Sequence, residues 1–86
     1  MNNKQRKTLA AIQEKPTRSD IEWKNIESLL LALGAEVSEG AGSRVRIKLN
    51  GIIGTFHKPH PRKIAKKYQV DSFREFLEKA GVGKNE

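Results

Sequence analysis

A chain of 86 residues makes one domain with a modest core, because chains this short bury only about 60% of their unfolded surface. The absence of cysteine excludes disulfides and cysteine-based metal sites, and it fits the cytoplasmic location that we expect. The net charge of +7 favours polyanionic partners. The N-terminus has no apolar signal region, which argues against secretion, and the chain has no apolar run of the ~20 residues that a membrane span needs, so no membrane partner is expected.

The N-terminal segment predicts a short helix over residues 4–15. Its apolar stripe is weak and consists of Leu9, Ile12 and, less clearly, Ala10. Pro16 stops the helix because proline lacks a backbone donor and restricts the residue before it. Such a thin stripe cannot form a core by itself, so we expect this helix to dock on the domain or on a partner.

A stronger helix follows. Ser19 and Asp20 offer N-cap chemistry just upstream, and Gly34 is a natural C-terminal stop. Apolar residues recur between these signals at helical spacing, which predicts a buried face. They are Trp23, Ile26, Leu29, Leu30 and Leu33.

Three strands are predicted next, over residues 35–39, 44–49 and 52–57. Asn50-Gly51 is the preferred two-residue type I′ loop, so the last two strands form a hairpin. The loop fixes the register and gives one apolar face and one polar face. The apolar pairs are Leu49 with Ile52, Ile47 with Gly54 and Val45 with Phe56, and the polar pairs are Arg46 with Thr55 and Arg44 with His57.

The C-terminal third contains a stiff segment, a basic loop and a last helix. Residues 59–61 read Pro-His-Pro and are extended, and residues 62–67 form the loop. Ser72 with Glu75 resembles a capping box, and Gly81 ends the helix in a Schellman motif. The apolar face of this helix is Val70, Phe73, Phe76, Leu77 and Ala80.

This order of elements predicts an α+β fold: a three-stranded antiparallel sheet with helices on one face. We expect residues 1–18 to be a helical extension, residues 19–82 to be the domain proper, and residues 83–86 to be a frayed tail. Aromatic residues on apolar stripes are expected in the core. These are Trp23, Phe56, Phe73 and Phe76. Tyr68 instead lies in the predicted basic loop, where it could stack on a base or anchor the loop.

The positive charge is concentrated in residues 40–70, which contain eight Lys or Arg and no carboxylate. The rest of the chain has nine Lys or Arg against ten Asp or Glu, so +8 and −1 sum to the net +7. A segregated field of this kind favours nucleic acid as the partner, ahead of anionic lipid or an acidic protein. The eight cations are Arg44, Arg46, Lys48, Lys58, Arg62, Lys63, Lys66 and Lys67.

Several short motifs occur in an order typical of one family. Leu33-Gly34 closes the leucine-rich helix, Gly42-Ser43 opens the hairpin, residues 59–61 follow it, and Lys79-Ala80-Gly81 closes the last helix. Over residues 19–82 the chain resembles the HicA family of bacterial toxins. The resemblance implies a double-stranded-RNA-binding-domain fold, mRNA binding and cleavage, and inhibition by a HicB-like antitoxin. The resemblance supports RNA contact, and the candidate RNA-binding residues are Ser43 and the eight cations that the charge distribution points to.

One position departs from that family. The Gly-Ser motif is usually followed there by a histidine taken to be catalytic, and Arg44 stands in its place. Metal-independent RNA cleavage needs a group that deprotonates the ribose 2′-hydroxyl and one that protonates the 5′-oxygen, and imidazoles suit both steps. His57 is the first candidate because it lies across from Arg44, with Arg44 and Arg46 holding the phosphate. His60, held by its prolines, is the second.

No metal site or cofactor is expected. Mg²⁺ prefers carboxylate ligands, which residues 40–70 lack, and two histidines three residues apart are a weak zinc signal. Three functions therefore remain open. The chain is an mRNA-cleaving toxin, a non-catalytic RNA-binding module, or a protein-interaction subunit whose basic face meets an acidic partner.

Overall fold

The computed structural model describes residues 1–82, so the predicted frayed tail lies outside the described residues. It contains three helices and one antiparallel sheet, which confirms the α+β class. The sheet has the strand order β1-β2-β3 and is open at both edges. The elements are α1 (Asn3–Gln13), α2 (Trp23–Ala32), β1 (Glu36–Glu39), β2 (Arg44–Leu49), β3 (Ile52–His57) and α3 (Lys67–Lys79).

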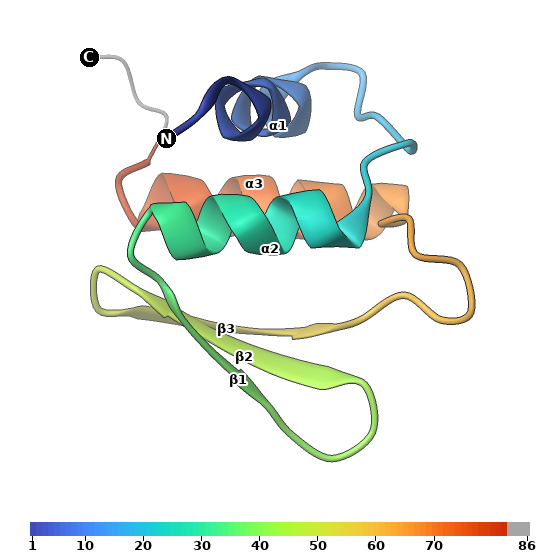
Figure 1. Ribbon diagram of the computed structural model, residues 1–86, viewed down its shortest axis with the longest axis vertical. Helices are drawn as coiled ribbons and strands as arrows, with labels where there is room; N and C mark the ends of the chain where they lie inside the picture. The colour runs from blue at the N-terminus through green and yellow to red at the C-terminus, as the bar shows by residue number, and fades with distance from the viewer. Residues whose placement is uncertain (83–86) are drawn as a thin grey trace.

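The elements form three layers (Figure 1). The sheet is one layer, α2 and α3 cover one of its faces and meet through Trp23 and Phe73, and α1 lies on the far side of these two helices. Within residues 1–82, α1 contacts α2 and α3 but no strand. No helix of residues 1–82 covers the opposite face of the sheet, which is therefore open to solvent.

The predicted register of the hairpin is confirmed. Leu49 lies opposite Ile52, and Arg44 lies opposite His57, as the two-residue loop requires. Asn50 and Gly51 have φ values of 51° and 82°, the left-handed pair that a type I′ turn needs. Because successive side chains of a strand point to opposite faces of the sheet, the residues of β2 are alternately exposed and buried.

The core lies between the sheet and the helix pair. Phe56 of β3 stacks on Phe73 with ring centroids 4.2 Å apart, and it meets Phe76 edge-on at 5.7 Å. Trp23 also packs against Phe73, with ring centroids 5.5 Å apart. The four aromatic residues predicted for the core are all buried. Gly54 gives the rings their room, because a Cβ there would lie 2.9 Å from both Phe56 and Phe76.

The helix starts differ from the local capping signals. α2 is preceded by Glu22 and not by Ser19 or Asp20, and the Asp20 carboxylate accepts hydrogen bonds from Arg18. The guanidinium holds the pKa of Asp20 below its ordinary value through these hydrogen bonds. α3 begins at Lys67, so Ser72 lies inside the helix and caps nothing. Both predictions of an N-cap are wrong. At the start of α2 the Trp23 N–H donates to the Lys63 carbonyl at 2.9 Å, and at the start of α3 the Lys66 N–H donates to the Gln69 side chain at 3.0 Å.

The end of α3 follows the prediction. The Gly81 N–H donates to the Glu78 carbonyl at 3.0 Å and the Val82 N–H donates to the Leu77 carbonyl at 2.8 Å. This pair of bonds is a Schellman motif, with Gly81 at a φ of 81°. The Asn50 side chain also donates to the Ala80 carbonyl at 2.7 Å, which ties the hairpin turn to the end of the helix.

The N-terminal helix docks on the domain. Ile12 is fully buried and Ala11 is also buried, whereas Ala10, which was predicted to join the stripe, is exposed. The Arg74 side chain of α3 donates to the carbonyls of Ile12 at 2.9 Å and Glu14 at 3.0 Å. These bonds satisfy carbonyls at the C-terminus of α1 and join it to the layer beneath.

Candidate nucleic-acid interface

The open face of the sheet carries a row of cations. Because Val45, Ile47 and Leu49 are buried, Arg44, Arg46 and Lys48 all lie exposed on the outer side of β2. On β3 their partners are His57, Thr55 and Ile53, and on β1 they are Ser38 opposite Arg46 and Glu36 opposite Lys48.

A shallow concavity of about 590 Å³ lies on this open face. Arg44 and Arg46 border it from β2, and Thr55 and Ile53 border it from β3. Guanidinium groups present planar, bidentate donors that match phosphate oxygens. The row therefore provides a place for the backbone of a nucleic acid.

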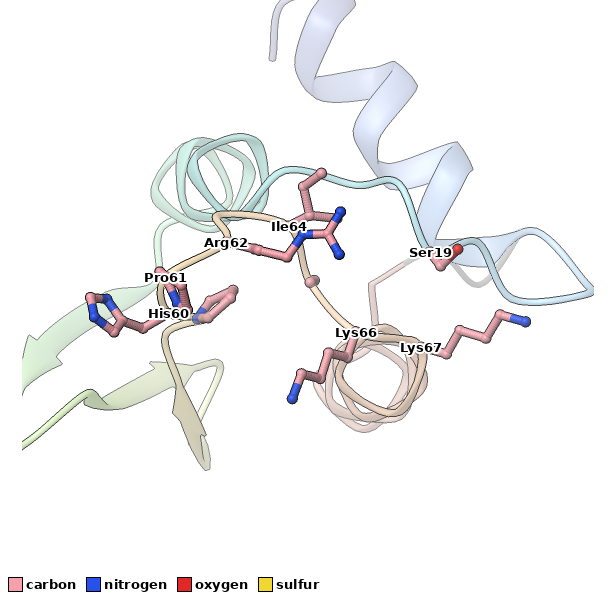
Figure 2. Close-up of a pocket in the computed structure, with 9 residues that line it drawn as sticks. Ser19, His60, Pro61, Arg62, Ile64, Lys66 and Lys67 are labelled. Carbon is pink, nitrogen blue, oxygen red and sulfur yellow. The ribbon is translucent and has the colours of Figure 1, made fainter.

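The basic loop borders a second concavity, of about 630 Å³ (Figure 2). Arg62, Lys66 and Lys67 contribute its cations, and Ser19 also lines it. Figure 2 shows the His60 ring directed away from Lys66 and Lys67. The candidate imidazole of this loop and the lysines at the start of α3 thus face different directions.

Lys58 and Lys63 border a third concavity, of about 330 Å³, together with Trp23 and Pro59. Lys58 is also paired: its ammonium lies 2.6 Å from the Glu39 carboxylate of β1. That hydrogen bond raises the pKa of Lys58 above its ordinary value. Over residues 1–82, Lys58 is the only one of the eight predicted cations in an ion pair.

The predicted site residues therefore do not gather in a single pocket. The arginines of β2 share the open sheet face with His57, while Arg62, Lys66 and Lys67 line the loop concavity. Ser43 is exposed at the start of β2, and its carbonyl accepts a hydrogen bond from the Lys58 N–H at 2.8 Å. That bond extends the β2–β3 ladder and joins the sheet to the loop.

The two histidines lie in different places. His57 borders a small concavity of about 100 Å³ between β3 and α3, with Tyr68, Gln69 and Ser72. His60 borders the larger loop concavity. His57 is the cross-strand partner of Arg44, although Arg44 borders the concavity on the open sheet face and His57 borders the one beside α3. His57 and His60 also border different concavities.

Gln69 is a residue of this region that the sequence did not single out. Its side chain is buried, it donates to the His57 carbonyl at 2.6 Å, and it accepts from the Lys66 N–H at 3.0 Å. These two bonds place the first turn of α3 against the end of β3. The bond to His57 has no signal in the local sequence, because its two residues lie twelve positions apart, whereas the bond from Lys66 is a local one at the start of the helix.

Two kinds of site are not seen in the described part of the chain. No three His, Asp or Glu side chains of residues 1–82 gather closely enough to hold a metal ion. None of the helices there has the length and apolar character that a bilayer crossing requires.

One comparison with known proteins identifies a family. The family described as "HicA toxin of bacterial toxin-antitoxin" matches residues 23–82, well over half of the chain. The match covers α2, the whole sheet and α3, and it begins after α1. Neither a curated protein nor a solved structure matches the chain significantly. The extent of the family match shows that this chain belongs to the HicA family of toxins from bacterial toxin–antitoxin systems.

Proposed function

We propose that this protein is a cytoplasmic HicA toxin that binds RNA through its cationic surfaces, cleaves mRNA, and is neutralised by a HicB-like antitoxin. The observation that carries the proposal is the exposed row of Arg44, Arg46 and Lys48 on the one sheet face that no helix covers. Phosphate contacts of this kind supply most of the affinity in nucleic-acid binding. Membership of the family supports the same function.

Cleavage would use the pair formed by His57 and Arg44. A deprotonated ribose 2′-oxygen attacks the adjacent phosphorus, and the P–O5′ bond breaks as the 5′-oxygen takes up a proton. His57 supplies the acid–base function, because it is exposed on the face that Arg44 also occupies. Arg44 and Arg46 stabilise the charge that develops on the phosphate. His60 is the second candidate for proton transfer.

A second function has its own support. Arg44 occupies the position where the family usually has histidine, so this chain could bind RNA without cutting it. The same cationic surface serves both functions, and only the imidazoles separate them. A non-catalytic RNA-binding module is therefore the alternative.

The test compares the parent chain with His57→Ala, His60→Ala and the double variant. Binding is measured on structured RNA between low and high salt, and cleavage is measured on mRNA. We expect all four proteins to bind with a steep loss of affinity as salt rises, and the His57 variant to cleave at least ~tenfold more slowly. Lys7→Ala on α1 is the control for a cation outside the proposed surface.

Each outcome decides between the candidates. Equal cleavage by the parent and the double variant would rule out the histidines as catalysts. Binding without cleavage, and without growth arrest on induced expression, would support the non-catalytic module. Affinity that stays flat from low to high salt would contradict RNA binding by this surface.

The antitoxin is proposed to act by charge complementarity. A HicB-like partner that placed acidic side chains over Arg44 and Arg46 would exclude RNA from the sheet face. RNA and antitoxin should then compete for the same residues, which a displacement assay with labelled RNA measures. Simultaneous binding of both would contradict this mode of neutralisation.

A further inference from the structure

Tyr68 is an aromatic residue that the core does not use. The other four large aromatics of residues 1–82 are buried, whereas Tyr68 is 63% exposed. It lies in the first turn of α3 and not in the basic loop. An exposed aromatic ring of this size has no packing role in the fold, so its surroundings indicate what else it can contact.

Those surroundings are the small concavity beside His57. Tyr68 and Ser72 lie four residues apart, on one face of α3, and form one wall. Thr55 and His57 of β3 border the other side, and the buried Phe56 lies between them along the strand. The ring therefore borders the same opening as the proposed acid–base residue.

The backbone at Tyr68 is held in place by its neighbour in the chain. Gln69, which is 5% exposed, bonds both the His57 carbonyl and the Lys66 N–H, so these bonds hold the first turn of α3 against the end of β3. Lys66 and Lys67 precede Tyr68 directly and carry no ion pair within the described residues. The Tyr68 ring and His57 border one concavity, while Lys66 and Lys67 border the loop concavity from the same end of α3. An aromatic ring for a base and cations at the same end of the helix for phosphate are the combination that binds single-stranded nucleic acid.

We propose that Tyr68 is a stacking platform for one unpaired base, and that the RNA bound beside His57 is single-stranded at this point. The inference rests on the proposed function, and it specifies the class of RNA. A base inside an A-form duplex is already stacked on both faces and cannot lie on a side chain, whereas an unpaired base can. The duplex implied by a double-stranded-RNA-binding fold is therefore not the substrate at this position.

The experiment uses the full chain and two RNAs of equal length, made with 2′-O-methyl groups so that no cleavage can occur. One is single-stranded and carries 2-aminopurine, and the other is the same strand in a duplex. We expect 2-aminopurine fluorescence to fall when the single strand binds the parent chain. Tyr68→Ala should lose that change and bind about 5- to 150-fold more weakly, the range for one stacked base. Tyr68→Phe should retain both, because stacking needs the ring and not the hydroxyl.

Three outcomes would overturn the stacking role: equal affinity of parent and Tyr68→Ala for the single strand, fluorescence change retained in Tyr68→Ala, or an equal loss of affinity for the duplex. The salt dependence of binding distinguishes a failure of base stacking by Tyr68 from a failure of the proposed RNA binding. If Tyr68→Ala binds as tightly as the parent with the same steep salt slope, stacking is wrong while RNA binding stands. If the parent itself binds neither RNA, the proposed function fails and the inference fails with it.

Discussion

Gln69 and His57 connect the two elements that border the candidate site. The Gln69 side-chain amide donates to the His57 carbonyl at 2.6 Å, from a position where Gln69 itself is buried. The bond fixes the backbone of His57 while leaving its imidazole exposed on the sheet face. Gln69 therefore joins the end of β3 to the first turn of α3.

Replacing Gln69 tests this role. Gln69→Met keeps the volume but leaves the His57 carbonyl and the Lys66 N–H without their partner, so we expect a loss of about 1–3 kcal/mol in the free energy of unfolding. Urea titration measures it. Gln5→Met is the matched control, because Gln5 makes its hydrogen bonds to Asn2 and Ser28 in solvent and should cost much less. Equal losses in the two variants would contradict a special role for Gln69.

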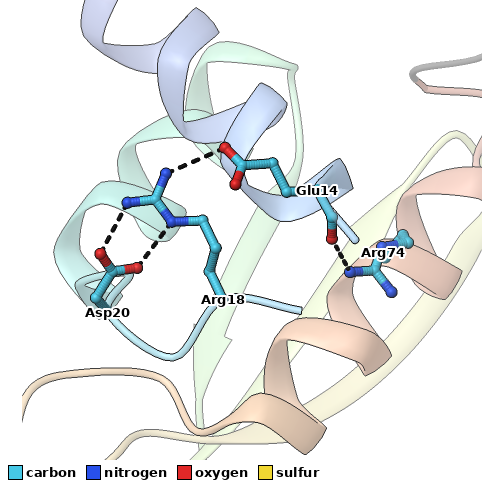
Figure 3. A network of polar contacts seen from close by, with 4 residues as sticks. All are labelled: Glu14, Arg18, Asp20 and Arg74. Atoms are coloured by element: carbon cyan, nitrogen blue, oxygen red, sulfur yellow. Dashed lines mark hydrogen bonds and ion pairs between the residues drawn. The ribbon is translucent and has the colours of Figure 1, made fainter. Parts of the chain in front are cut away.

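Arg74 holds the N-terminal helix in place (Figure 3). Its guanidinium donates to the Ile12 and Glu14 carbonyls and its side chain is only 12% exposed. We expect Arg74→Met to destabilise the fold by about 2 kcal/mol, because these carbonyls lose a charged donor. In this variant, the rate of amide hydrogen exchange should increase more in α1 than in the sheet. Arg18→Met is the control: Figure 3 shows Arg18 bridging Glu14 and Asp20, and ion pairs as exposed as these contribute little.

Gly54 is predicted to resist substitution. A methyl group there would lie 2.9 Å from the rings of Phe56 and Phe76, which are packed in the core and cannot move apart freely. Gly54→Ala should therefore lower the free energy of unfolding by about 1–3 kcal/mol. Gly40→Ala is the control, because a Cβ at Gly40 has no neighbour nearer than 3.9 Å. Equal thermal midpoints for the two variants would contradict the packing argument.

Asp71 makes the free energy of unfolding depend on pH in the acidic range. The Thr17 hydroxyl donates to its carboxylate and Arg74 pairs with it, and these contacts lower the pKa of Asp71 below its ordinary value. A carboxylate with a lowered folded-state pKa stabilises the fold above its ordinary pKa, and that contribution is lost as pH falls through the folded value. Asp71→Asn should therefore be less stable than the parent at neutral pH and converge with it at strongly acidic pH. Urea titrations at both pH values measure this, and a constant difference would contradict it.

The Glu39–Lys58 pair should restrain RNA binding. Glu39 holds the Lys58 ammonium at 2.6 Å and adds a negative charge next to the proposed surface. Glu39→Gln should tighten RNA binding at low salt and steepen the dependence of log K on log salt by up to about one unit, because one more cation meets phosphate. Glu75→Gln on α3 makes the same change in net charge elsewhere. Equal tightening by both variants would show an effect of net charge alone.

The features that could be predicted from the sequence are those fixed by local patterns. The period-two alternation of β2 and the Asn50-Gly51 loop set the hairpin register, and that register alone places Arg44 opposite His57. Gly81 likewise set the end of α3. The parts of the site that depend on contacts distant in the chain could not be predicted, and these include Gln69 beside His57 and the Glu39 partner of Lys58.

The sequence by itself determined the segregated charge, the register of the hairpin, the aromatic core and the family. Each of these depends on residue type and on spacing along the chain, which neighbours in space do not alter. The tertiary structure alone decided where α3 begins, that α1 docks through Arg74, and that Tyr68 lies exposed beside His57. Local sequence allows α3 to begin at several neighbouring residues, and the observed start is the one at which Gln69 also reaches the His57 carbonyl of β3, twelve residues earlier.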